Sequence, residues 1–224
     1  MGRAVRLIVV LVLAGCESEE PSGPVGVEAP CDGPALRFEP SGSYRVTIEE
    51  RGQTYRSTLR FEPSDDGWSA VETELSVEPP SGSIGSLDGA ELRWQLDESG
   101  VPLEPPRVRG EAHPGVLQNL TAFAFRPAGL TMDPVCQEIV LMRRWVDGME
   151  RTRRTSYQVA SVNDERVTFS VTSTITTAVN EWRSEGRVSV DRTDGFTGTA
   201  ELEVTGPGTP REGYERRVVV ERVE

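Results

Sequence analysis

Lysine is missing from this sequence, and histidine occurs once. All 24 basic residues of the 224-residue chain are arginines, and the single histidine is His113. Without lysine the chain has no group for Schiff-base chemistry, for a P-loop or for a serine–lysine dyad. One histidine also excludes a zinc or iron site built from several histidine ligands. The composition therefore predicts no cofactor and no metal.

An excess of positive charge is missing too. The chain has 36 acidic against 24 basic residues, a formal net charge of -12. Such a surface repels phosphate backbones, so we expect no nucleic-acid partner. The mean hydropathy of -0.39 and the 36% of hydrophobic residues are typical of a globular body rather than of a polytopic membrane protein.

The first apolar run, residues 7–13, is much shorter than the roughly 20 residues of a membrane-spanning helix. It follows Arg3 and Arg6 and ends in the tetrapeptide Leu13-Ala14-Gly15-Cys16. A basic start, a short apolar segment and small residues at its end are typical of a secretory signal peptide. Residues 1–15 are therefore predicted to be a signal peptide.

The tetrapeptide resembles the lipobox of bacterial lipoproteins, with leucine at −3, alanine at −2, glycine at −1 and the cysteine at +1. The resemblance covers the first sixteen residues. It implies cleavage before Cys16 and attachment of a diacylglyceryl group to its thiol, so that Cys16 anchors the protein to a membrane of the cell envelope. Glu17, where some inner-membrane lipoproteins have aspartate, favours the outer membrane facing the periplasm over the inner membrane or the cell surface. The alternative is an ordinary secretory signal in which Cys16 is incidental.

Residues 16–35 are rich in proline, glycine and acidic residues and have no apolar period, which predicts a disordered tether before a folded domain at 36–224. The two remaining cysteines, Cys31 and Cys136, each lie in a turn-like stretch. In an oxidising compartment two such thiols predict one disulfide. A redox or metal role is disfavoured because the chain has no CxxC motif.

Apolar residues beyond residue 36 recur with a period of two, which predicts strands with one buried face. The longest example is residues 167–179, with Val167, Phe169 and Val171 on the buried face and small hydroxyl residues on the other. Shorter strands are predicted with the following residues inside: Tyr44, Val46 and Ile48; Val71, Thr73, Leu75 and Val77, with Glu72 outside; Leu92, Trp94 and Leu96; Ala200, Leu202 and Val204. Residues 139–146 fit a strand better than a short helix, and residues 116–125 fit either.

Turn signals such as Arg51-Gly52, Asp65-Asp66-Gly67 and Asn163-Asp164 separate these runs. Short connections between strands predict an all-β domain with little helix, made of one twisted antiparallel meander sheet that closes as a barrel, a half-barrel or a sandwich. Residues 36–104 and 137–224 show a similar order of strands and turns, so two loosely similar halves stay open as an alternative.

Motifs for catalysis are weak. His113 lies in a loop, and no GxSxG elbow is present for a triad. Acid pairs at turns are typical of solvated loops, and the aspartates around Asp194 form part of a calcium ligand set interrupted by Arg192. The four tryptophans are scattered and fit core positions better than a sugar platform. A basic patch is predicted around one hairpin, where an anionic headgroup or acidic partner could bind, from Arg143, Arg144, Arg151, Arg153 and Arg154.

The sequence thus favours a lipid-anchored envelope protein that is not an enzyme. Its β domain is predicted to be a binding module for an apolar ligand or an envelope protein partner. The close alternative is a structural or assembly accessory without a ligand cavity. A hydrolase using two carboxylates is a third and weaker hypothesis.

Overall fold

The computed structural model describes residues 34–79, 89–98, 107–110, 130–132, 152–210 and 213–223, three isolated positions (87, 100 and 103), and the backbone of residues 24–28, 137–146 and 149–151. Twelve strands form one antiparallel sheet in this part of the chain, and no helix occurs in it. The strands are β1 (Pro24–Glu28), β2 (Ser43–Glu50), β3 (Gln53–Ser64), β4 (Gly67–Glu78), β5 (Glu91–Leu96), β6 (Arg107–Arg109), β7 (Gln137–Val146), β8 (Met149–Val162), β9 (Arg166–Thr176), β10 (Glu181–Asp191), β11 (Gly198–Thr205) and β12 (Tyr214–Val223).

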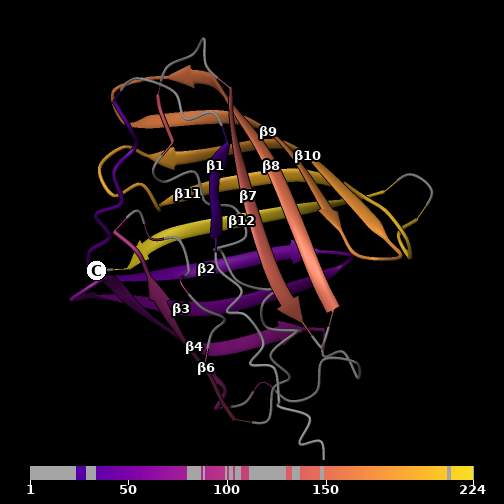
Figure 1. The fold of residues 1–224 in the computed structure, drawn as a ribbon. Helices are drawn as coiled ribbons and strands as arrows, with labels where there is room; N and C mark the ends of the chain where they lie inside the picture. Colours follow the sequence, from indigo (N-terminus) through magenta and orange to yellow (C-terminus); the bar gives the residue numbers. More distant parts are fainter. Residues whose placement is uncertain are drawn as a thin grey trace, which may run out of the picture.

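The sheet consists of two meanders joined side by side. Its order is β1-β7-β8-β9-β10-β11-β12-β2-β3-β4-β5-β6, and the junction is the antiparallel pair of β12 with β2. Figure 1 shows the sheet turning through β9 to β12, so that β7 and β8 run steeply across the direction of β2 to β4. β1 and β6 are the two edges, so the sheet is open, as in a half-barrel or a sandwich, and is not a closed barrel. The all-β prediction is confirmed.

Tight turns connect neighbouring strands as expected. Arg51 and Gly52, between β2 and β3, both have positive φ angles (51° and 74°), as a type I′ hairpin turn requires. In the β8–β9 turn, the side-chain oxygen of Asn163 accepts hydrogen bonds from the backbone N–H groups of Glu165 and Arg166. The positive φ angles explain why the chain reverses at Arg51 and Gly52, and the side-chain bonds of Asn163 explain the reversal between β8 and β9.

One face of the sheet forms a continuous core. Buried apolar side chains from β2 to β5 pack in a single cluster with those from β8 to β12. The predicted inward residues of β2, β5 and β11 are buried, and so are Val167, Phe169 and Val171 of β9. Period-two alternation therefore identified most of the inner face.

Two sequence expectations were wrong in detail. The strand predicted for residues 167–179 ends at Thr176, because the Thr177 hydroxyl oxygen accepts bonds from the N–H groups of Val179 and Asn180 and forms a turn. Val179 is consequently 79% exposed. In β4 the predicted inner face is correct for Leu75 but not for residues 71 and 73, because a β-bulge lies between these two parts of the strand.

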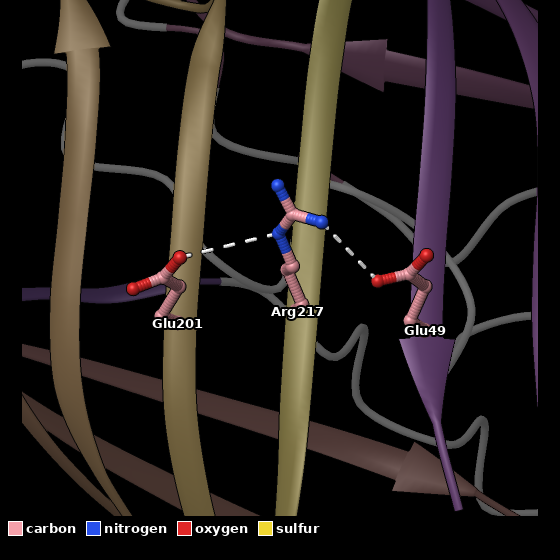
Figure 2. A network of polar contacts seen from close by, with 3 residues as sticks. All are labelled: Glu49, Glu201 and Arg217. Carbon is pink, nitrogen blue, oxygen red and sulfur yellow. Dashed lines mark hydrogen bonds and ion pairs between the residues drawn. The ribbon is translucent and has the colours of Figure 1, made fainter. Parts of the chain in front are cut away.

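The opposite face of the sheet carries charges in cross-strand pairs. Arg217 of β12 lies between Glu49 of β2 and Glu201 of β11, with N–O distances of 3.5 and 3.9 Å (Figure 2). All three side chains are at least half exposed. Exposed pairs of this kind contribute little stability, about 0.2–1 kcal/mol each, so this face is a solvated surface.

One strand settles a choice between strand and helix, and another lies in a stretch that the sequence predicts to be disordered. β7 confirms the preference for a strand at residues 139–146. Pro24–Glu28, within the stretch predicted to be a tether, forms β1 and pairs with β7. Residues 116–125 lie outside the described residues.

Candidate functional site

A β-bulge in β4 changes which side chains of that strand face the core. Arg56 of β3 is paired with Ser76 and Thr58 with Thr73, so two steps along β3 correspond to three along β4. The extra residue lies at Glu74, which has a positive φ angle of 54°. Such a conformation is strained for a residue other than glycine. The Thr58 hydroxyl donates a 2.6 Å hydrogen bond to the Glu74 carboxylate and supports this backbone.

The bulge places Glu72 inside the protein. Leu75 and Val77, after the bulge, face the core as predicted, but before it Ala70 and Glu72 do so instead of residues 71 and 73. The inward parity changes because one residue is inserted into a pattern of period two. Glu72 is only 2% exposed. The sequence prediction that this glutamate lies on the outer face is therefore wrong.

The Glu72 carboxyl group is incompletely satisfied. The Ser57 hydroxyl donates a 2.6 Å hydrogen bond to Oε1, whereas Oε2 is buried without a hydrogen-bond partner among the described residues. Burial raises the pKa of Glu72, and the side chains of Ser57 and Trp94, which favour the charged form, offset part of that rise. The resulting pKa is about 7. A buried group that titrates near neutral pH is a candidate for function.

A small pocket lies beside this carboxyl group. It has about 230 Å³ of empty space, open solvent included. The interior of the pocket admits about one water molecule.

The lining of the pocket is mainly apolar, with Val46 and Ile48 from β2, Leu75 from β4 and Leu87. Tyr55, Arg56, Ser57 and Ser76 also line it. We refer to this feature as the Glu72 pocket. Small-molecule sites also combine apolar and polar lining residues, but they are far larger, about 300–1,000 Å³, than this space for about one water molecule.

Charged side chains also enter the inner face near the β2–β3 hairpin. Arg216 of β12 forms an ion pair with Glu50 of β2, with 3.2 Å between Nε and Oε2. Arg153 of β8 donates a 3.1 Å hydrogen bond to the Ser173 hydroxyl of β9. Burial lowers the pKa of both arginines, and burial raises the pKa of Tyr55, which the Glu50 carboxylate raises further. Tyr55 thus connects this charged region with the Glu72 pocket.

A second buried carboxylate lies in an aromatic region of the core. Asp194 is 4% exposed and accepts hydrogen bonds from the backbone N–H groups of Phe196 (2.8 Å) and Thr197 (2.9 Å). The hydroxyls of Thr197 and Tyr44 donate to its other oxygen, at 2.6 and 3.2 Å. The rings of Tyr44 and Phe196 pack edge-to-face at 5.1 Å. We call the group of neighbouring rings the aromatic cluster; its members are Phe38, Tyr44, Phe61, Trp68 and Phe196.

This arrangement accounts for the aspartates considered as calcium ligands. Asp191 accepts a bond from the N–H group of Thr193, and Asp194 holds its own loop against β2. Among the residues that the structure describes, no group of three or more histidine, cysteine, aspartate and glutamate side chains could hold a metal ion. The acid pair Asp65 and Asp66 is exposed in the β3–β4 turn.

The predicted basic patch is not on one face of the sheet. Arg153 points to the inner face, where it contacts Ser173, while its neighbour Arg154 is exposed. Adjacent residues of a strand point to opposite faces, so the sequence cluster is divided by the sheet. The side chains at positions 143, 144 and 151 lie outside the described residues.

The other sequence candidates also lie outside the described part: Cys16, Cys31, Cys136 and His113. The sequence missed Glu72 because a bulge formed at glutamate, rather than at glycine, leaves no signal in the pattern. No helix in the described residues is long and apolar enough to cross a membrane. No family model, curated protein or solved structure matches the chain.

Proposed function

We propose that this chain is a lipid-anchored protein of the bacterial envelope whose β domain is a non-enzymatic binding module. The Glu72 pocket receives a small polar group of the ligand, and the apolar part of the ligand lies on the open side of the pocket. The supporting observation is that a strained bulge at Glu74 directs a buried, incompletely hydrogen-bonded carboxyl group beside a partly open apolar pocket. Strained backbone and unsatisfied buried groups persist where a function requires them.

The proposed anchor is the lipidated Cys16, on the outer membrane facing the periplasm. Two or three acyl chains anchor a protein stably, since each buried methylene contributes about 0.8 kcal/mol. The mature protein should begin at a diacylated Cys16, as intact mass measurement of the natural protein would show. The Cys16→Ser variant should leave the membrane fraction; if it stays there, the anchor assignment is wrong.

A disulfide between Cys31 and Cys136 belongs to the same proposal. On one side of these positions Glu28 pairs with Ile139, and on the other Ala35 forms a bridge with Thr131. Counting three residues forward from Glu28 and three back from Ile139 leads to Cys31 and Cys136. Peptide mapping without reductant should find the two linked. Replacing both by serine should lower the free energy of unfolding by about 4 kcal/mol, because the bridge closes a long loop. Two free thiols in the oxidised natural protein would contradict the proposal.

Ligand binding is tested with the Cys16→Ser form of the full chain. Native mass spectrometry should detect a co-purified apolar molecule, and Leu87→Trp, which fills the pocket, should abolish its retention. Leu103→Trp is the matched control, since Leu103 is 40% exposed and does not line the pocket. Equal retention in the two variants would contradict binding in the Glu72 pocket.

The structural or assembly accessory is the second candidate. It is favoured by the continuous packing of the inner face, where side chains from both meanders belong to one cluster. A clean mass with no bound molecule, and no effect of Leu87→Trp on any added ligand, would favour this candidate over the binding module.

A further inference from the structure

The Glu72 pocket combines an open acceptor position with space for a small group. Oε2 of Glu72 has no hydrogen-bond partner among the described residues, and the adjoining space admits about one water molecule. A ligand group that fits there must be small and must donate a hydrogen bond to this oxygen when the carboxyl group is charged.

No cation of the described residues compensates the Glu72 carboxylate. The groups that favour its charged form are the neutral side chains of Ser57 and Trp94. Arg56 lines the pocket, but its guanidinium is paired with Glu78 at 2.7 Å. Tyr55 is the other titratable residue of the lining. β2 contributes the apolar Val46 and Ile48, so the carboxylate lacks the countercharge that a buried charge ordinarily has.

An ammonium group would supply both the hydrogen-bond donor and the positive charge that Glu72 lacks among the described residues of this pocket. It has about the size of a water molecule, donates hydrogen bonds and carries the opposite charge, and charge-assisted bonds of this kind are roughly twice as strong as neutral ones. An alkyl chain attached to it would leave through the open side of the pocket, past the apolar lining residues Leu75, Leu87 and Ile48. A carboxylate ligand would be repelled, and an alcohol would supply the hydrogen bond without the charge.

We infer that the Glu72 pocket binds the ammonium group of a primary alkylamine, with its chain against the apolar lining. This inference rests on the proposed binding function and specifies its ligand class. Because the carboxyl group must be ionised to attract the ammonium, binding should strengthen as the pH rises through the pKa of Glu72, which is about 7.

Calorimetric titration of the full chain carrying Cys16→Ser tests this, with n-butylammonium and n-butanol as probes. The amine should bind at least tenfold more tightly at pH 8 than at pH 5, and at pH 8 at least tenfold more tightly than the alcohol. Glu72→Gln, which keeps the shape of the side chain, should remove both differences. Glu62→Gln is the matched control, because Glu62 is an exposed glutamate of β3 that does not line the pocket, and it should leave the pH dependence of amine binding in place.

The outcomes separate the two claims. If butanol binds as tightly as butylammonium, or if Glu72→Gln leaves the amine affinity unchanged, the ammonium inference is wrong while the binding function stands. If neither probe binds and no apolar molecule co-purifies, the ammonium inference and the binding function both fail. Thermal unfolding of each variant ensures that a loss of binding reports on the pocket and not on the fold.

Discussion

Asp194 and Glu72 are both buried carboxyl groups, but the number of hydrogen bonds that they accept differs. Asp194 accepts four hydrogen bonds, two from backbone N–H groups and two from hydroxyls, and joins the β10–β11 loop to Tyr44 of β2. Glu72 is as deeply buried, but among the described residues only the Ser57 hydroxyl donates a short hydrogen bond to it, and Oε2 has no hydrogen-bond partner there. The Trp94 side chain also favours the charged form of Glu72. Asp194 and Glu72 are therefore equally buried but differ in the number of hydrogen-bond donors around them.

The difference separates a structural carboxylate from an available one. A carboxylate whose lone pairs are used by its own loop stabilises that loop and has little capacity left for a ligand. A carboxyl group with an unused oxygen destabilises the protein in its charged form and gains most from a partner. The aromatic cluster around Asp194 and the pocket beside Glu72 fit these two roles.

Asp194→Ala should have the largest effect. It leaves the N–H groups of Phe196 and Thr197 and the hydroxyl of Tyr44 without their acceptor, so we expect the free energy of unfolding to fall by about 4 kcal/mol. Urea unfolding measures it. Asp191→Ala, which removes a single bond from Thr193, should lower it by about 1 kcal/mol. Equal losses for the two variants would contradict the structural role of Asp194.

Glu72→Gln should change how stability depends on pH. The pKa of Glu72 is raised from 4.5 to about 7, so the folded protein keeps this proton when the unfolded chain has lost it. The stability of the wild type should therefore decrease between about pH 4.5 and pH 7, by about 3 kcal/mol from this group, and level off above. The variant should lack this decrease.

Unfolding curves at intervals of pH provide the measurement for Glu72. Glu62→Gln is the matched control, because Glu62 is an exposed glutamate of β3. The pH profile of that variant should follow the wild type. A Glu72→Gln profile that also follows the wild type would show that this carboxyl group has no raised pKa.

Tyr44→Phe tests the hydrogen bonds of Asp194 with a smaller change than Asp194→Ala. The hydroxyl of Tyr44 accepts a bond from the N–H of Ser41 and donates one to Asp194, while the ring is kept in the variant. The loss of stability should be about 1.5 kcal/mol. Double-mutant analysis with Asp194→Ala should show coupling between the two positions. Strictly additive effects would argue against a shared hydrogen-bond network.

Ser57→Ala should have the smallest effect, and it tests the hydrogen bond between Ser57 and Glu72. Ser57 favours the charged form of Glu72, so its removal should raise the pKa of Glu72 further above its ordinary value. We expect a loss of about 1 kcal/mol above pH 7 and a smaller one at low pH. The midpoint of the pH–stability curve should move upward; a downward shift would contradict the hydrogen bond.

Much of the fold could be predicted because strands with one buried face repeat every second residue. The inward residues of β2, β5 and β11, the turn at Arg51-Gly52 and the strand at β7 followed from local patterns. The site could not be predicted in the same way. Glu72 lies between Val71 and Thr73, so simple alternation assigns it to solvent, and only the extra residue at Glu74 reverses that assignment.

The sequence by itself determined the all-β class, the alternation of strands and turns, and the residues that resemble a lipobox, because each depends on a few neighbouring residues. Tertiary structure alone decided that β12 pairs with β2, that β1 and β6 form the edges, and that Glu72 faces a pocket. These features depend on pairing between residues far apart in the chain. A single inserted residue in one strand changes the face of every side chain on one side of it, and no local pattern records which side becomes buried.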